Sequence, residues 1–281
     1  MDTILKSTTK EVKISIDKPF VVIGEKVNPT GRKILAGALA EGNYDYVLEL
    51  VKKQVDAKAD ILDVNVGVPG LDEVKVLPEV AKLISDNYDL PLCLDSANHD
   101  ALAAALAVLP GKLLINSVNG EEKSLEKVLP LVKEYGAAVI GLTMDDDGIP
   151  SDVETRVSIA GKIIERAAKL GISEEDIVID PLVLTVGADS NAALVTLGTI
   201  DMIRKEFGVN INLGASNVSF GLPDRHTVNQ AFLSLAISKG ATCAITDPVK
   251  LTSIIRATDL LMGRDKSSLR YLKFYRSQQK K

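Results

Sequence analysis

Short apolar segments and longer amphipathic segments alternate along the whole chain. Eight segments are continuous apolar runs, which is typical of parallel strands covered on both faces. They are Phe20–Glu25, Ile61–Asn65, Pro91–Asp95, Lys112–Asn116, Ala137–Thr143, Ile177–Asp180, Ile211–Leu213 and Ala241–Ile245. Each run is followed by a segment in which apolar residues recur at helical spacing. These segments are Tyr44–Lys58, Asp72–Asp86, Asp100–Leu109, Ser124–Tyr135, Asp152–Leu170, Ala192–Phe207, His226–Lys239 and Lys250–Met262.

Eight strand–helix units predict an α/β fold in which the parallel sheet closes into a (β/α)8 barrel. A doubly wound open sheet is the alternative, and such a sheet usually has a G-x-G-x-x-G turn after its first strand. The segment Gly24–Gly31 lacks that spacing, which favours the barrel. We expect one barrel domain over residues 1–281, with a polar N-terminal lead at 1–18. The basic C-terminal tail at 264–281 is expected to be a solvated, partly helical end rather than a partner-binding arm.

Composition and charge exclude several classes of function. The net charge of −5 and the pI of about 5.3 argue against a nucleic acid as the main partner. No apolar run approaches the roughly 18 residues that cross a bilayer, so no membrane segment is expected. Cys93 and Cys243 lie in apolar strand segments and are expected to be buried thiols of a cytoplasmic protein. Because His99 and His226 are the only histidines, we expect no bound metal.

Carboxylates and amides mark the ends of the predicted strands. They are Glu25, Asn28, Asp63, Asn65, Asp95, Asn116, Asp180, Asn217 and Asp247. The C-terminal ends of the strands meet at one mouth of a barrel, so these side chains are expected to surround one cleft. A single such residue would be an ordinary helix cap, but a ring with few basic residues suits a neutral, nitrogen-rich ligand. The edge of a pterin ring fits, because one carboxylate accepts two parallel N–H bonds.

The loop Gly214–Arg225 joins the seventh strand to its helix and is rich in small residues. Small residues let a ligand approach the backbone closely. The loop also carries the amide of Asn217, the hydroxyls of Ser216 and Ser219, and the guanidinium of Arg225. An ordinary turn is the alternative reading, since Asn and Ser also stabilise turns.

Seven motifs, in this order along the chain, resemble those of the pterin-binding family. They are VIGEKVN at 22–28, DILDVNVG at 60–67, LCLDS at 92–96, INS at 115–117, IGLT at 140–143, IDPL at 179–182 and GASNVS at 214–219. The resemblance is strongest to methyltetrahydrofolate:corrinoid/iron–sulfur-protein methyltransferases and weaker to the folate module of cobalamin-dependent methionine synthase. It implies a pterin-binding TIM barrel, usually a homodimer, that binds 5-methyltetrahydrofolate at its C-terminal mouth.

The resemblance also implies roles for individual residues. The folate-site residues carried over by position are Asp95, Asn116, Asp180, Asn217 and Arg225. The first three would hold the pterin edge, and Asn217 would reach the N5 region. Phe220 stands where the corrinoid/iron–sulfur enzymes have a glutamine, and in this respect the chain is more similar to methionine synthase.

The expected chemistry is transfer of the N5-methyl group of 5-methyltetrahydrofolate, with Asn217 as the catalytic residue. The tertiary amine is a poor leaving group, so a hydrogen bond that strengthens towards the transition state would assist the transfer. The chain has neither a zinc-binding set for a thiol acceptor nor an Asp-x-His-x-x-Gly cobalamin signature. We therefore expect a separate corrinoid protein to carry the Co(I) cobalamin or related corrinoid. The sequence leaves open the direction of transfer and the choice between tetrahydrofolate and tetrahydromethanopterin.

Two alternatives share the same pocket. Dihydropteroate synthase would need an anion site for pyrophosphate near the eighth strand, and the sequence there has no basic residue before Lys250. A non-catalytic folate-binding barrel would keep the pocket without turnover.

Overall fold

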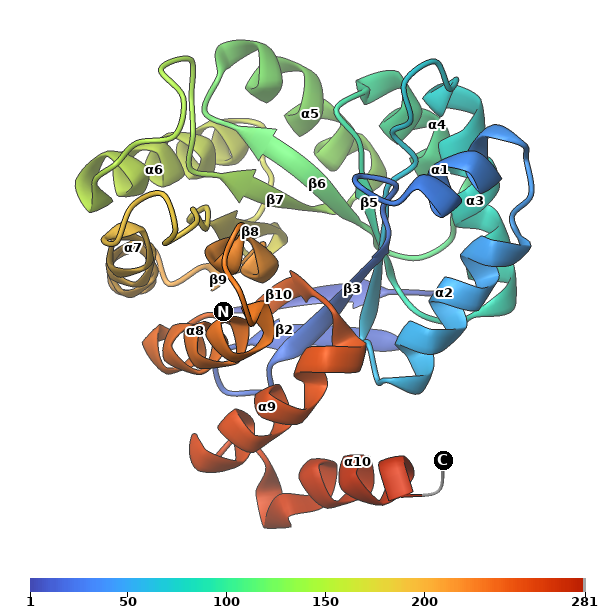
Figure 1. Ribbon diagram of the computed structural model, residues 1–281. Coiled ribbons are helices and arrows are strands. Elements are labelled where there is room, and N and C mark those ends of the chain that lie inside the picture. The colour runs from blue at the N-terminus through green and yellow to red at the C-terminus, as the bar shows by residue number, and fades with distance from the viewer. Residues whose placement is uncertain (280–281) are drawn as a thin grey trace.

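Figure 1 shows the computed structural model of the chain, in which residues 1–279 are described. An eight-stranded parallel sheet forms the centre, in the order β10-β3-β4-β5-β6-β7-β8-β9. Its strands are β3 (Val21–Val27), β4 (Ile61–Val64), β5 (Leu92–Asp95), β6 (Leu114–Asn119), β7 (Ala138–Leu142), β8 (Ile177–Asp180), β9 (Asn210–Ile211) and β10 (Cys243–Thr246). Bonds from Thr242 N to Ile211 O (3.0 Å) and from Ile245 N to Leu213 O (2.9 Å) join its two edges. The predicted (β/α)8 barrel is therefore confirmed.

The helices surround the sheet (Figure 1). They are α1 (Lys33–Ala40), α2 (Asp45–Asp56), α3 (Glu73–Asn87), α4 (His99–Val108), α5 (Glu122–Tyr135), α6 (Val153–Lys169), α7 (Ala192–Glu206), α8 (Arg225–Lys239), α9 (Pro248–Leu261) and α10 (Leu269–Gln279). Short 3-10 helices add η1 (Glu174–Asp176), η2 (Ala215–Ser219) and η3 (Lys266–Ser268). The helix α1, which is absent from the expected elements, has eight residues and no side-chain cap. None of the helices in residues 1–279 is long and apolar enough to cross a bilayer.

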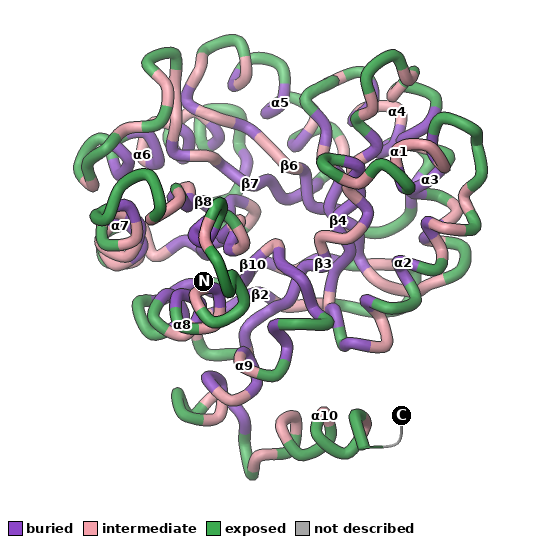
Figure 2. The backbone as a smooth tube through the Cα atoms, in the orientation of Figure 1, coloured by how far each residue is buried: buried purple, intermediate pink, exposed green. Residues whose placement is uncertain are grey.

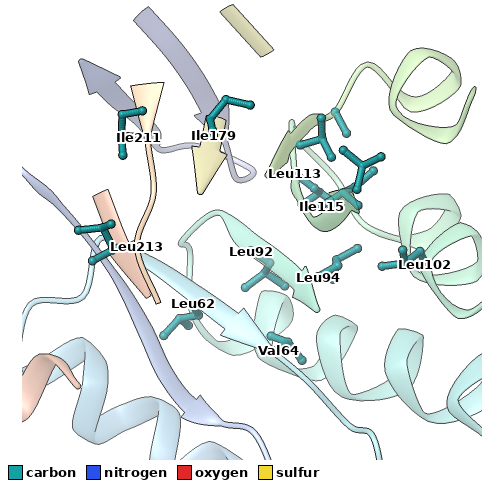
Figure 3. Close-up of a cluster of buried hydrophobic side chains, with 14 of the residues drawn as sticks. Leu62, Val64, Leu92, Leu94, Leu102, Leu113, Ile115, Ile179, Ile211 and Leu213 are labelled. Atoms are coloured by element: carbon teal, nitrogen blue, oxygen red, sulfur yellow. The ribbon is translucent and has the colours of Figure 1, made fainter. Parts of the chain in front are cut away.

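The strands divide their side chains between two layers of core. One set packs outwards against the helices, and Figure 3 shows members of it such as Leu62 and Leu92. The alternate set, including Ile61 and Cys93, fills the barrel interior. Strand residues two positions apart share a face, and each fully buried aliphatic side chain contributes about 1.5–3 kcal/mol. Figure 2 shows the resulting concentration of buried residues along the strands.

The alternation of side chains along each strand determines where the ring of polar residues lies. In five strands, an interior-facing apolar residue is followed, two positions later, by a polar residue on the same face. The pairs are Ile23 with Glu25, Ile61 with Asp63, Cys93 with Asp95, Leu114 with Asn116, and Val178 with Asp180. The polar side chains therefore lie one layer above the apolar interior, at the C-terminal mouth.

An antiparallel hairpin of β1 (Asp2–Lys6) and β2 (Glu11–Ser15) closes the opposite end of the barrel. Leu5 and Ile14 of this hairpin are fully buried in the interior cluster. Asn210 of β9 anchors it by donating to Ile14 O at 3.0 Å. The expected polar lead at residues 1–18 thus contains two strands, which five-residue segments of mixed charge do not reveal as a pattern.

The C-terminal tail contains the helix α10, which has no buried residue. Leu269, its first residue, is 66% exposed. Figure 1 shows α10 beside α9 and outside the ring of helices. The last two basic residues of the tail, at 280 and 281, lie outside the described residues.

Candidate active site

A cavity of about 350 Å³ opens at the C-terminal mouth of the barrel. It is lined by Glu25, Asn28, Thr30, Arg32, Asn116, Leu142, Asp180, Leu182, Val183, Gly214, Ser216, Asn217 and Ile245. Three predicted site residues therefore meet in one cavity, because Asn116, Asp180 and Asn217 all line it. Asp95 lines an adjoining cavity of about 320 Å³ that shares Asn116 as a wall. Arg225 lies outside the main cavity and lines a third one next to it.

Asp180 lines the main cavity and is 5% exposed. Its carboxylate accepts hydrogen bonds from Leu182 N at 2.9 Å and from Asn212 Nδ2 at 2.8 Å. Burial raises the pKa of Asp180 to about 6, and these bonds only partly offset the burial. Asn212 was missed by the sequence analysis, although it lies two positions after the interior residue Asn210 and so follows the same alternation.

Two further carboxyl groups face each other near Asn116. Asp63 is almost fully buried, and its Oδ1 lies 3.5 Å from Asn116 Nδ2. Burial, together with the neighbouring Asp95 carboxylate, raises the pKa of Asp63 well above its usual range. Burial also raises the pKa of Asp95 to about 6. Burial of both groups and their mutual repulsion therefore disfavour ionisation of both carboxyl groups at once.

Asn217 lies in the short helix η2, at the rim of the cavity. Its backbone is held by bonds to Gly214 O (3.2 Å) and from Phe220 N (3.1 Å). Its side-chain amide is exposed and makes no hydrogen bond to any residue in 1–279. An amide both donates and accepts, so this group is free to bond a ligand that enters the cavity.

Arg225 fixes the loop that carries Asn217. Its Nε donates to Ser219 Oγ at 3.1 Å, and its Nη2 donates to Ser216 O at 2.6 Å. The guanidinium also lies over the ring of Phe220, 5.7 Å from the centroid. Phe220 itself is 68% exposed. Arg225 thus positions the loop, a role that the sequence analysis did not foresee, while its contact with folate stays a prediction.

The expectation that the ring contains few basic residues is wrong. Lys26 Nζ lies 2.5 Å from Asp247 Oδ2 and 3.6 Å from Glu25 Oε1. Lys26, Arg32, Arg225 and Lys250 together form a basic wall on one side of the mouth. Lys26 therefore offsets part of the negative charge of Glu25 and Asp247. Within residues 1–279, no three His, Cys, Asp or Glu side chains form a metal-binding group.

We predict that the affinity for a ligand with an N–H-rich edge falls as the pH drops below about 6. Asp95 and Asp180, each with a pKa near 6, lose acceptor capacity on protonation. The Kd should be constant above pH 7. Well below the pKa, each of the two groups should raise the Kd about tenfold for every unit by which the pH falls. Calorimetric titrations from pH 5 to 8 would measure it. In Asp180→Asn only Asp95 still titrates, so the Kd should rise less steeply on acidification. A wild-type Kd that does not change with pH would contradict the prediction.

Comparisons with known proteins identify the family of the chain. The profile of the pterin binding enzyme family matches residues 24–247. A methylcorrinoid:tetrahydrofolate methyltransferase of Eubacterium limosum is 30% identical over 262 residues, which cover 92% of this chain and 96% of that protein. Methionine synthase of Mycobacterium tuberculosis is 32% identical over 253 residues. That match covers 85% of this chain but 21% of the enzyme, so the chain spans about a fifth of its length.

Solved structures share the fold. Dihydropteroate synthase of Yersinia pestis, in complex with a pterine-sulfa conjugate, has a TM-score of 0.71 and 17% identity, covering 94% of this chain and 100% of that one. The Xanthomonas albilineans enzyme with 4-aminobenzoic acid has a TM-score of 0.70 and 20% identity, covering 92% and 98%. At these identities the likeness supports the fold alone. The profile match and the similarity to the Eubacterium limosum protein show that the chain belongs to the pterin-binding enzyme family.

Proposed function

We propose that this protein transfers the N5-methyl group between 5-methyltetrahydrofolate and the corrinoid of a separate corrinoid protein. The observation that carries the proposal is the convergence of Asn116, Asp180 and Asn217 on one cavity, with the side-chain amide of Asn217 bonded to no residue in 1–279. The name of the 30% identical relative supports the same reaction.

The buried end of the cavity suits the pterin ring. The Asp180 carboxylate accepts parallel N–H bonds from the amino–imino edge, and the Asn116 amide donates and accepts beside it. Asn212 and the backbone of Leu182 hold Asp180 in place, so little reorganisation accompanies binding. Asp95 reaches the pterin from the adjoining cavity across Asn116.

The chemistry at N5 requires relief of the charge that develops as the C–N bond breaks. Asn217 donates a hydrogen bond to N5 that strengthens in the transition state. An amide has no proton to give, so the proton reaches N5 through water that enters from solvent at the open mouth of the cavity.

The acceptor approaches the open mouth. A Co(I) corrinoid supplies the nucleophile that takes the methyl group. The residues of this chain at the rim of the cavity form the surface that the corrinoid approaches. Asn217 and the 68% exposed Phe220 present a polar and an apolar group on this rim. The rim therefore leaves N5 accessible from outside while Asp180 holds the opposite edge of the pterin in the cavity.

We extend the proposal to a homodimer in the cytoplasm. The thiols of Cys93 and Cys243 are buried and free, as a reducing compartment allows. Exposed apolar side chains on α9 and α10, including Leu261 at 87%, offer area for self-association. Sedimentation equilibrium would measure the mass in solution.

The proposal is tested by mixing the protein, 5-methyltetrahydrofolate and free Co(I) cobalamin without oxygen. We expect the spectrum of the methylated corrinoid to develop, and to be absent when the protein is omitted. If neither free cobalamin nor a purified corrinoid protein is methylated, the proposed function is wrong.

One observation favours dihydropteroate synthesis as a second candidate, because the basic wall beside Asp247 could hold an anion. Incubation with a pterin pyrophosphate and 4-aminobenzoate separates the two functions. We expect no pteroate, whereas its formation would favour the second candidate.

A further inference from the structure

A separate cavity of about 350 Å³ lies at the end of the barrel opposite to the mouth. The loop that leads into β4, the turn of the N-terminal hairpin, α9 and α10 all contribute to its walls. The lining residues are Lys10, Val55, Lys58, Ala59, Asp60, Leu90, Arg256, Arg270, Lys273 and Phe274. None of these described residues lines the pterin cavity, so methyl transfer at the mouth does not account for this cavity.

Positive charge is concentrated in this cavity. Five cations line it against one carboxylate, that of Asp60, although the chain as a whole has a net charge of −5. Lys10, Lys58 and Lys273 are exposed and form no ion pair with any residue in 1–279. These three lysines come from three separate segments and repel one another, so an anion bound among them would relieve the repulsion.

The two arginines of the cavity give a second indication of an anion, because their ion pairs are long. Arg256 is 3% exposed, and its Nη2 lies 3.5 Å from Asp60 Oδ2 while its Nη1 lies 3.7 Å from Asp259 Oδ2. Arg270 Nη2 lies 3.4 Å from Asp60 Oδ1. Charge-assisted bonds of this kind usually span about 2.7–2.9 Å. The carboxylates of the chain therefore satisfy the two guanidinium groups only in part.

The rest of the cavity wall is apolar, formed by Val55, Ala59, Leu90 and Phe274. Phe274 lies on the same face of α10 as Arg270 and Lys273, since the three residues are spaced three and four positions apart. The helix α10 has no buried residue, so this face is not packed into the core. The occupant should therefore combine negative charge with an apolar surface.

We propose that this cavity binds a phosphate monoester carried on a flat ring, of the kind that a nucleoside monophosphate presents. Lys58, Lys273 and Arg270 donate hydrogen bonds to the phosphate oxygens. The ring lies against Phe274, as bases stack on aromatic side chains. The volume is near the lower end of the range of about 300–1,000 Å³ for small-molecule sites, which favours a monophosphate over a longer polyphosphate. The ligand would join α10 to the body of the barrel.

The test compares AMP with adenosine, which lacks the phosphate, and with inorganic phosphate, which lacks the ring. Calorimetry at low ionic strength would give the Kd of each for the wild type, Lys273→Glu, Phe274→Ala and the control Arg276→Glu. Arg276 is a matched control because it is exposed on the same helix and does not line the cavity. We expect the wild type to bind AMP at least about tenfold more tightly than either of the other compounds.

The variants test the two halves of the cavity. Lys273→Glu should raise the Kd of AMP at least about tenfold, since a charge-assisted bond is lost and a repulsive charge is added. Arg276→Glu should change this Kd less than about twofold, because the charge at position 276 lies outside the cavity. Phe274→Ala should raise the Kd of AMP to that of inorganic phosphate.

The inference is overturned if the wild type does not bind AMP or binds it no more tightly than inorganic phosphate. An equal loss in Arg276→Glu would also overturn it, because such a loss would reveal only the general field of the protein. Weaker AMP binding in Asp180→Asn would place AMP in the pterin cavity and refute the inference. Methyl transfer by Lys273→Glu should equal that of the wild type, so the inference and the proposed function can fail separately.

Discussion

Asn217→Ala should lower the rate of methyl transfer by a factor of about 100 or more while changing the Kd of 5-methyltetrahydrofolate only a few-fold. The loss of one preorganised donor at a centre of developing charge typically costs that much. The side chain is exposed and bonded to no described residue, so its removal leaves no buried group without a partner. The effect should therefore fall on the transition state rather than on folding or on binding of the substrate.

Single-turnover measurements with free Co(I) cobalamin would isolate this step from product release. Asn191→Ala is a matched control, since Asn191 precedes α7 and makes no side-chain cap. We expect its rate to equal that of the wild type. An unchanged rate in Asn217→Ala would remove Asn217 from the mechanism, and an equal fall in affinity and rate would make it a binding residue only.

Asp180→Asn should weaken folate binding by a factor of about 100 without lowering the stability of the ligand-free protein. The carboxylate accepts from two directions inside the protein and from the pterin edge, whereas an amide presents one oxygen and a competing NH₂ group. Loss of a charge-assisted pair of bonds accounts for the fall in affinity. Weaker folate binding without a loss of stability would show that the Asp180 carboxylate serves binding rather than folding.

The expected stability follows from the pKa. Burial raises the pKa of Asp180 from 3.8 to about 6, so the folded state binds its proton more tightly than the unfolded state. At pH 7 the ionised group therefore costs about 3 kcal/mol of stability, a cost that disappears as the pH falls through 6 towards 4. Asp180→Asn has no ionised group to bury and therefore avoids this loss of stability, but its amide also forms fewer of the hydrogen bonds that the carboxylate accepts. We expect its Tm at pH 7 to match or exceed that of the wild type, and the difference to shrink on acidification.

Thermal unfolding at pH 7 and pH 4.5, together with calorimetry of folate binding at pH 7, would check both parts. A lower Tm for Asp180→Asn at pH 7 would mean that the carboxylate is a structural anchor. Wild-type affinity in this variant would exclude Asp180 from the pterin contact.

The apolar runs were sufficient to predict the barrel and its polar ring, because a parallel strand covered on both faces leaves a strong local signal. The alternation of side chains then determines which residues reach the mouth, as Ile61 and Asp63 illustrate. Other features depend on contacts that no local pattern encodes. Lys26 and Asp247 are adjacent only because β3 pairs with β10, at opposite ends of the chain. For this reason the basic wall was not predicted.

The hairpin at the N-terminus was not predicted because each strand is short and its pattern is only partly alternating. The role of Arg225 in holding the loop was also not foreseen. It depends on the left-handed backbone at Asp224, which turns the chain into α8. In both cases the tertiary packing, rather than the sequence pattern, decides the local structure.

The N-terminal hairpin determines how substrates reach the pterin cavity. Leu5 and Ile14 seal the lower end, so the pterin cavity has its entrance at the mouth, where the corrinoid must also arrive. Folate and the corrinoid therefore use the same opening of the barrel. A corrinoid seated over the mouth blocks the passage of folate in either direction, which makes folate the first to enter and the last to leave.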